Sequence, residues 1–275
     1  MKHIKTLSDI SHHYDTYLVD VVGVVWDGQD PIMGAITAIN TLIEQDKRVI
    51  FLSNNPRPSD GLYKKLVEYG ITPKVQALCS GDATVQYIER NFPGKTVYHL
   101  GANRNDEILS QTNYKTTERI VDSDFILLTA YLNPDEDLTM YAQDLDWIIQ
   151  HKPRILCANP DVYAPMEEGQ LRRCGGYIGH HLEQHGVSVD YMGKPSAMIY
   201  EMVFQMFNID PSHKSKCLMI GDTLETDITG AAGFGIDSLL VLTGNTGREI
   251  LSVSSSIENP LKTKNIIPTY IAEEL

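Results

Sequence analysis

The sequence predicts a doubly wound α/β fold built on a parallel sheet. Short apolar runs rich in strand-forming residues alternate with amphipathic stretches of helical period, as in strands joined by crossover helices. The run at 17–19 ends on Asp20, and the run at 216–220 is closed by Gly221 and Asp222. Ligands of open α/β sheets bind at the carboxyl ends of the strands, so both carboxylates are candidates for chemistry.

The elements of the first domain follow from hydrophobic period and from turn residues. Isoleucine and leucine recur at helical spacing within 34–46, between two strand-like runs. Ser59 can cap a further helix, and Gly70 can end it. We expect a strand at 17–19, a helix at 34–46, a strand at 48–52 and a helix from Ser59 to Gly70.

Two polar segments stand where strands and helices meet loops. Ser53, Asn54 and Asn55 follow the strand at 48–52 and offer small hydrogen-bonding side chains. Lys194 lies just before an apolar helix, where the helix dipole disfavours a positive charge. This position indicates an anionic neighbour for Lys194, and a solvated surface lysine is the alternative.

The alternation of strands and helices restarts near Gly81 and is long enough for a second, smaller α/β domain. We expect an inserted domain at 82–188 and a core domain formed by 1–81 and 189–275. The inserted domain is predicted to hold strands at 96–100, 124–131 and 154–158 and helices at 138–149 and 175–185. The returning chain is predicted to form strands at 216–220 and 238–242 around a helix that starts at Thr226, and a last edge strand at 269–272.

Three aspartates of the core domain suggest a metal site. Asp20 and Asp222 end strands, and Asp227 lies in the first turn of a helix, where its charge is favoured. Three converging carboxylates would repel one another without a cation between them, and Mg²⁺ prefers oxygen ligands. The alternative for each is a turn or cap residue, a common role of aspartate.

Composition restricts the class of protein. The 275 residues carry a formal net charge of -13, which argues against nucleic acid or an anionic membrane as a partner. No apolar run approaches the ~20 residues of a membrane span, and the first residues lack the apolar core of a signal peptide. The four cysteines are scattered without a CxxC pair, so we expect free thiols in a reducing cytoplasm.

Two other sequence patterns could indicate binding sites. His181 and His185 are four residues apart on a predicted helix with His180 and Glu183, a spacing that could bind a metal. A third ligand is missing from the pattern, so exposed histidines on a helix face are favoured. The glycines of 230–235 end a helix instead of opening one, which does not fit a dinucleotide-binding loop.

Taken together, these motifs resemble the haloacid dehalogenase-like (HAD) superfamily, in its NagD-type or class IIA branch. The resemblance covers nearly the whole chain, and the branch carries a cap domain at the place of 82–188. Each motif is weak alone, and their common order makes the pattern specific. The matching residues are Asp20 with Gly23, Ser53-Asn54-Asn55, Asn159-Pro160-Asp161, Gly193-Lys194-Pro195, Gly221-Asp222 with Thr226-Asp227, and Val241-Leu242-Thr243-Gly244.

The resemblance implies a role for each of these site residues. Asp20 would be the nucleophile that forms an aspartyl-phosphate. Asp20, the backbone carbonyl of Val22 and Asp222 would bind Mg²⁺, and Asp227 would support these ligands. Ser53 and Lys194 would hold phosphoryl oxygens. Asn54 and Asn55 would position the substrate or a loop.

The sequence departs from the phosphatase pattern at Val22. That pattern has a second aspartate here, which protonates the leaving oxygen and then activates water. General acid–base help accelerates a reaction about 10²- to 10⁴-fold, so we expect weak hydrolysis of ordinary phosphomonoesters. Asp27 could substitute for the missing acid, although a hairpin-turn aspartate is the favoured interpretation.

The leading hypothesis is therefore a Mg²⁺-dependent HAD-type hydrolase that acts, like a phosphatase, on a small phosphorylated metabolite. The alternatives are a weakly catalytic sensor that binds such a metabolite and a HAD enzyme that cleaves another kind of bond. Specificity is expected from the inserted domain, with the loop at 161–169 and Gly175-Gly176 as first candidates. A homodimer is possible in the resembled branch.

Overall fold

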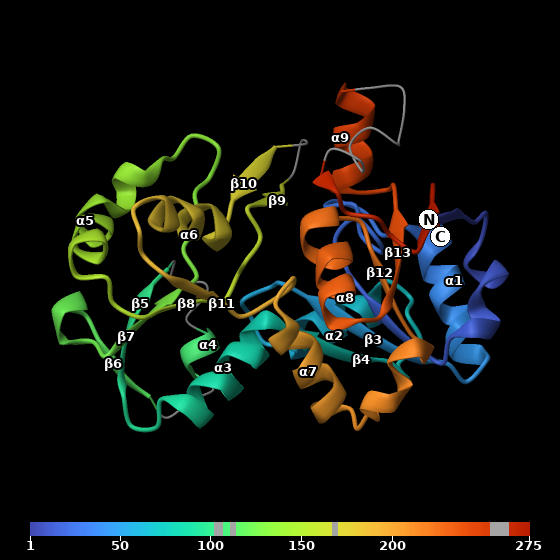
Figure 1. The fold of residues 1–275 in the computed structure, drawn as a ribbon, viewed down its shortest axis with the longest axis horizontal. Helices are drawn as coiled ribbons and strands as arrows, with labels where there is room; N and C mark the ends of the chain where they lie inside the picture. Colours follow the sequence, from blue (N-terminus) through green and yellow to red (C-terminus); the bar gives the residue numbers. More distant parts are fainter. Residues whose placement is uncertain (102–106, 111–113, 167–169, 254–263) are drawn as a thin grey trace. The chain divides into compact units, whose positions relative to one another are not determined.

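A computed structural model describes residues 1–101, 107–110, 114–166, 170–253 and 264–275. The chain forms two compact units. The core unit comprises Met1–Ser53, Asp60–Leu78 and Lys194–Leu275. The inserted unit comprises Asn54–Ser59 and Cys79–Gly193. Each unit is built on its own sheet flanked by helices (Figure 1).

The core unit contains a seven-stranded sheet with the order β1-β14-β13-β12-β2-β3-β4. The pairs of β2 with β3 and β12, and of β13 with β12 and β14, are all parallel. The sheet thus has the doubly wound topology that the sequence predicts. Its strands are β1 (Lys2–His3), β2 (Thr16–Val19), β3 (Arg48–Ser53), β4 (Gln76–Cys79), β12 (Cys217–Gly221), β13 (Asp237–Val241) and β14 (Tyr270–Ala272).

Both faces of this sheet are covered, which explains why its strands are continuous apolar runs. Tyr17 and Val19 of β2 belong to a buried cluster that includes Ile39, and Leu18 between them is also fully buried. On α7 and α8, Tyr200 stacks on Phe234. The helices of the core unit are α1 (Met33–Glu44), α2 (Ser59–Glu68, which starts at the unit boundary), α7 (Ala197–Met206), α8 (Thr229–Phe234) and α9 (Asn245–Val253).

The prediction that the strand at 269–272 lies at the edge of the sheet was wrong. The strand β14 forms there but pairs with both β13 and β1, so it lies inside the sheet. The edge is taken by Lys2–His3 of β1, which carries no apolar period by which a strand could be recognised.

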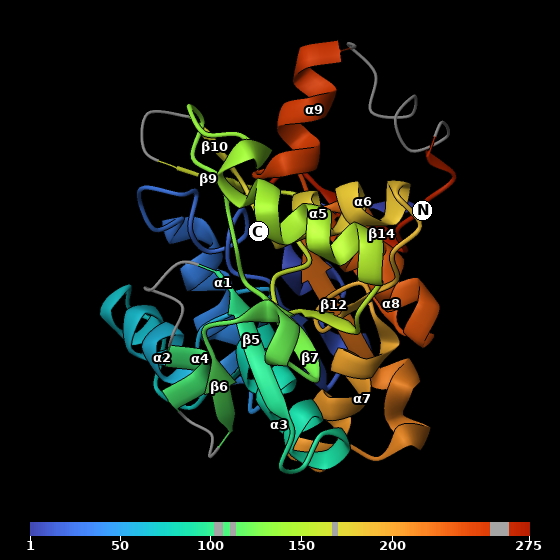
Figure 2. The ribbon, with the colours of Figure 1, turned by 90° about the vertical axis from the view of Figure 1, so that its left-hand side faces the viewer.

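The inserted unit contains a five-stranded sheet with the order β11-β8-β7-β5-β6, and all four of its strand pairs are parallel. The strands β5, β6 and β7 lie side by side (Figure 2). The strands are β5 (Thr96–Leu100), β6 (Lys115–Thr117), β7 (Phe125–Leu128), β8 (Ile155–Cys157) and β11 (Val189–Tyr191). A hairpin of β9 (Tyr163–Pro165) and β10 (Leu171–Arg173) accompanies them, with helices α3 (Ser80–Asn91), α4 (Glu107–Ser110), α5 (Ala142–His151) and α6 (Gly175–Gln184).

Two stretches of the inserted unit differ from their predicted form. The strand predicted at 124–131 ends at Leu128, because the N–H groups of Thr129 and Ala130 both donate to the carbonyl of Leu100. Residues 189–191, which the sequence analysis places in the core domain, pair with β8 of the inserted sheet.

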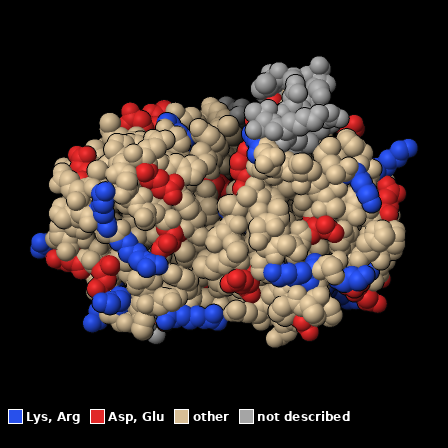
Figure 3. Space-filling model, viewed as in Figure 1, with Lys and Arg blue, Asp and Glu red and all other residues tan. Residues whose placement is uncertain are grey.

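Charged side chains of both signs are interspersed on the molecular face drawn in Figure 3. Within the described ranges, no helix combines the length and the apolar character that crossing a bilayer requires.

Candidate active site

Two strand ends bring the first two aspartates together. Val19 of β2 pairs with Ile220 of β12, and the N–H of Asp20 donates to the carbonyl of Ile220 at 2.9 Å. Asp222 directly follows β12. Because the strands are parallel and in register, both carboxylates leave the sheet at the same edge.

A π-helical turn supplies the third carboxylate. This turn spans Leu224–Ile228, and the N–H of Thr223 donates to Oδ2 of Asp227 at 3.1 Å. Asp20, Asp222 and Asp227 each offer a carboxylate oxygen, and these oxygens lie within 4.8 Å of one another. Among the described residues this is the group of three close acids, histidines or cysteines that could hold a metal ion.

Lys194 joins two of these carboxylates. Its Nζ lies 2.6 Å from Oδ1 of Asp20 and 2.8 Å from Oδ1 of Asp227, and its side chain is 2% exposed. Burial alone would lower the pKa of Lys194, but the two carboxylates together raise it above its ordinary value. The anionic neighbours expected for Lys194 are thus Asp20 and Asp227, and the ammonium stays charged.

One ammonium does not balance three carboxylates. Burial, followed by the charges of Asp20 and Asp227, raises the pKa of Asp222 well above its ordinary value. Burial also raises the pKa of Asp227, and this effect outweighs the lowering by Lys194. A site of oxygen donors with excess negative charge fits a hard divalent cation such as Mg²⁺.

Backbone close to Asp222 confines its carboxylate. A Cβ on Gly23, whose φ is +86°, would lie 2.5 Å from Cγ of Asp222, and a Cβ on Gly244 would overlap Oδ2. The N–H of Asn245 donates to that Oδ2 at 2.5 Å, and the hydroxyl of Thr243 donates to the carbonyl of Gly23. Asn245 has no sequence signal of its own, although it directly follows the Thr243-Gly244 pair of the resembled motif.

The position two residues after Asp20 carries no ionisable group. Val22 is partly buried and lies in the turn that follows Asp20, where its neighbour Gly23 donates from N–H to the carbonyl of Trp26 at 2.6 Å. The turn that follows Asp20 therefore carries an apolar side chain at this position.

Asp27 is a turn residue. Its Oδ1 accepts hydrogen bonds from the N–H groups of Gln29 and Asp30 at 2.8 and 2.9 Å. These bonds lower the pKa of the exposed Asp27 carboxyl. A group held ionised in this way is a poor proton donor, which agrees with the favoured interpretation of Asp27.

The segment after β3 divides between the two units. Ser53 is the last residue of β3 and is buried in the core unit. Asn54 and Asn55 belong to the inserted unit, where Nδ2 of Asn54 donates to Oδ1 of Asp161 at 2.7 Å. Ser53 thus stands at the end of the strand next to β2, and the hydrogen bond of Asn54 to Asp161 lies within the inserted unit.

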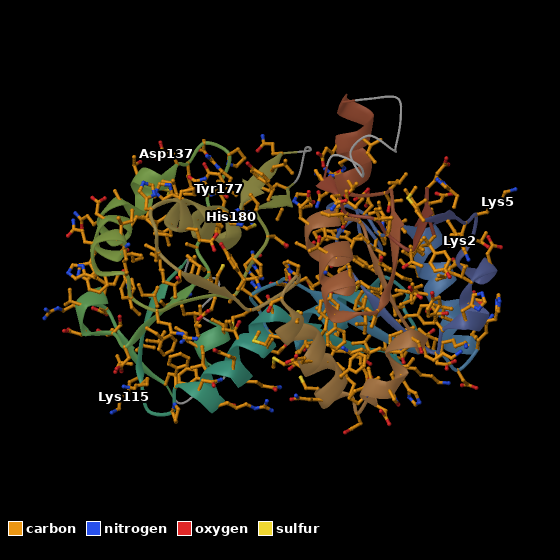
Figure 4. All side chains as sticks on the ribbon, viewed as in Figure 1. Lys2, Lys5, Lys115, Asp137, Tyr177 and His180 are labelled. Atoms are coloured by element: carbon orange, nitrogen blue, oxygen red, sulfur yellow. The ribbon has the colours of Figure 1, made fainter. Side chains whose placement is uncertain are left out.

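Among the described residues, the histidines of 180–185 do not belong to a cluster of three potential metal ligands. Tyr177 and His180 lie on α6 (Figure 4), and His185 directly follows that helix. His180 and His185 are exposed, and Nδ1 of His185 lies 2.8 Å from the carbonyl of His181. Gly175 and Gly176, which were expected to contribute to specificity, begin the same helix. The N–H of Gly176 donates to the carbonyl of Asp161. Residues 167–169 of the loop at 161–169 lie outside the described residues.

Comparison with known proteins supports the resemblance. A family model described as haloacid dehalogenase-like hydrolase matches residues 17–115, and a HAD-hydrolase-like model matches residues 191–275. An acid sugar phosphatase of Staphylococcus aureus (strain USA300) is 28% identical over 267 residues, which are 95% of each chain.

Solved structures share the fold over nearly the whole chain. A haloacid dehalogenase-like hydrolase from Brucella suis 1330 has a TM-score of 0.82 and 24% identity, covering 99% of each chain. A possible sugar phosphatase from Cytophaga hutchinsonii has a TM-score of 0.81 and 22% identity, covering 100% of this chain and 98% of the other. A 4-nitrophenylphosphatase from Thermotoga maritima has a TM-score of 0.76 and 21% identity, covering 96% of each. Two family models of haloacid dehalogenase-like hydrolases thus match residues 17–115 and 191–275, and this chain belongs to the haloacid dehalogenase-like hydrolases.

Proposed function

We propose that the protein is a Mg²⁺-dependent phosphatase that acts on a small phosphorylated metabolite through an aspartyl-phosphate. The observation that carries this proposal is the meeting of Asp20, Asp222 and Asp227 with the buried Lys194. The phosphatase names of relatives from Staphylococcus aureus and Thermotoga maritima support the same chemistry.

Asp20 is the proposed nucleophile. A carboxylate oxygen of Asp20 would attack phosphorus, the bond from phosphorus to the leaving oxygen would break, and water would then hydrolyse the acyl phosphate. A carboxylate is a weak nucleophile, so placement and neutralisation of charge must lower the barrier. Lys194 forms an ion pair with Asp20 at 2.6 Å and would bring a positive charge to the phosphoryl group.

The residues that would hold Mg²⁺ are Asp20, Asp222 and the backbone carbonyl of Val22, with Asp227 beside them. The clustered oxygens and the raised pKa values of Asp222 and Asp227 fit a site completed by a cation. When bound, the ion would supply charge neutralisation to the transferring phosphoryl group. Ser53, at the end of the adjacent strand β3, is proposed to donate to a phosphoryl oxygen.

Val22 restricts the substrates that this site would serve well. Without a proton donor at this position, an alkoxide leaving group departs with its full negative charge. Acyl and aryl phosphates release a more stable anion, so we infer a preference for such leaving groups. The inserted unit is proposed to act as the cap that selects the substrate.

A second function is favoured by the same valine. A chain that binds phosphorylated metabolites but turns them over slowly would serve as a sensor. This alternative predicts tight binding with negligible turnover, whereas an enzyme would show multiple turnovers.

The test is turnover of 4-nitrophenyl phosphate with Mg²⁺ by the wild type, Asp20→Asn and Asp27→Asn. We expect turnover to require Asp20 and to persist in the Asp27 variant, which loses a carboxylate outside the site. Activity that survives unchanged in Asp20→Asn would refute the proposed nucleophile. Binding without turnover in the wild type would support the sensor.

A further inference from the structure

The chain passes between its two units directly beside two residues of the proposed phosphoryl site. The core unit includes Ser53, and the next residue, Asn54, belongs to the inserted unit. Gly193 is the last residue of the inserted unit, and Lys194 returns to the core. One peptide bond therefore separates each proposed phosphoryl ligand from a residue that the inserted unit holds.

Asn54 and Gly193, the residues at these two crossings, contact each other within the inserted unit. Nδ2 of Asn54 donates to Oδ1 of Asp161 at 2.7 Å, and Asn54 is only 3% exposed. Gly193 packs against the same group, because a Cβ there would overlap Oδ1 of Asn54 and lie 2.9 Å from Cγ of Pro160. We call the contact of Asn54, Asp161 and Gly193 the crossing clasp.

Further bonds attach both crossings to the end of β8. The carbonyl of Asn55 accepts from the N–H of Gly81 at 3.1 Å and lies 2.9 Å from Oγ of the buried Ser80. That Oγ is also 2.5 Å from the carbonyl of Ala158. On the other crossing, the N–H of Met192 donates to the carbonyl of Cys157 at 2.9 Å. The segment that runs from Cys157 to Asp161 thus holds both crossings.

We propose that Asp161 is a positioning residue for the phosphoryl site. By holding Asn54 against Gly193, it fixes the spacing of the two peptide bonds that lead to Ser53 and Lys194. This proposal rests on the proposed function and deepens it, because it assigns to the inserted unit a role in binding the phosphoryl group itself. Binding geometry matters strongly here, since a misplacement of about 1 Å can reduce a rate on the order of a hundredfold.

The donor and acceptor of the hydrogen bond between Asn54 and Asp161 can be exchanged by substitution, which allows a test of the clasp. Asn54→Asp would place two carboxylate oxygens against each other in a buried contact, and repulsion would open the clasp. Asp161→Asn keeps an oxygen acceptor of the same shape. The double variant N54D/D161N restores the hydrogen bond with the donor on the opposite side.

The experiment measures the affinity for inorganic phosphate by calorimetry with Mg²⁺, together with kcat and KM for 4-nitrophenyl phosphate. We expect Asn54→Asp to weaken phosphate binding and kcat/KM on the order of tenfold or more. Asp161→Asn should lose less, and N54D/D161N should regain most of the loss. Asp190→Asn is the matched control, because it removes a partly exposed carboxylate of the inserted unit that pairs with Arg154.

Thermal unfolding separates positioning from mere stability. A folded Asn54→Asp variant with wild-type phosphate affinity would overturn the proposed role of the clasp. A folded double variant that regains no phosphate affinity would do the same. If Asn54→Asp does not fold, Asp161→Ala carries the test, because it only deletes the acceptor, and unchanged phosphate affinity there would also overturn the clasp. Absence of phosphate binding by the wild type would overturn both the proposed function and the clasp, whereas binding that the variants leave unchanged overturns the clasp alone.

Discussion

Asp20 and Lys194 are 174 positions apart in the sequence, and their side chains form a 2.6 Å ion pair at the end of β2. The ion pair is shielded from solvent, since the side chain of Lys194 is 2% exposed and its second partner, Asp227, is fully buried. The pair therefore joins the first strand of the site to the segment that returns from the inserted unit.

Replacing Lys194 with methionine should damage both stability and turnover. The ammonium is the cation that Asp20 and Asp227 contact, and removing one partner of a buried ion pair costs about 3–5 kcal/mol. We expect chemical denaturation without metal to show a loss of this size, and Mg²⁺ to recover part of it. Lys264→Met, which removes a lysine paired with Glu225 and Glu249 near the surface, should cost less than about 1 kcal/mol. Equal losses in the two variants would contradict the buried pair.

Replacing Val22 with aspartate should increase hydrolysis of alkyl phosphates more than that of aryl phosphates. The new carboxyl would protonate the leaving oxygen, a contribution of about 10²- to 10⁴-fold in rate when the geometry is right. The measurement is kcat/KM for one alkyl and one aryl phosphate. Val22→Asn has a similar shape and cannot act as the acid, so it should give no gain. A gain in both variants would assign the effect to polarity instead of proton transfer.

Replacing Gly244 with alanine should weaken metal binding. The added Cβ would overlap the carboxylate of Asp222, so Asp222 or the start of α9 must shift. Titration with Mg²⁺, followed by calorimetry, should show a loss of affinity. Gly61→Ala is the control, because nothing lies within 4 Å of its Cβ and alanine in a helix adds about 0.5–1 kcal/mol of stability. Unchanged affinity in Gly244→Ala would show that the site tolerates displacement of Asp222.

The metal-free protein should lose stability as the pH rises from about 4 towards neutrality. The pKa values of Asp222 and Asp227 are raised above their ordinary value of 3.8. In this range the folded state binds more protons at these groups than the unfolded state, so their contribution to the free energy of unfolding falls with pH.

Mg²⁺ should oppose that loss, because it binds the ionised carboxylates. Its stabilising effect should be larger at about pH 7.5 than at about pH 5 and should reach about 2.7 kcal/mol when Mg²⁺ exceeds its Kd about 100-fold. Thermal unfolding of the wild type and of Asp222→Asn isolates the contribution of this site from other titrating groups. Identical pH and Mg²⁺ dependence in the two proteins would exclude Asp222 as its source.

The sequence allowed much of the core fold to be predicted, since its strands are buried on both faces and their apolar runs are continuous. The run at 48–52 and the first helix appear within one or two residues of their predicted bounds. The nearness of Asp20, Asp222 and Asp227 followed from parallel strands that end at one edge. The contact of Lys194 with Asp227 needed coordinates, because a helix start does not specify its neighbours.

Fewer elements of the inserted unit than of the core unit could be predicted from the sequence. The hairpin of β9 and β10 has strands too short for a clear alternation, and Tyr163 and Leu171 at their ends are exposed. The helix α3 was not predicted, although Asp82 accepts from the N–H of Cys79 and so marks its start. The bond of Asn54 to Asp161 joins residues 107 positions apart, which local pattern cannot reveal.

The partly buried place of Val22, in the turn after Asp20, has a consequence for the history of this enzyme. A valine codon that ends in a pyrimidine becomes an aspartate codon through a single nucleotide change. Under the function proposed above, the gain of an efficient phosphomonoesterase would then require a single nucleotide change.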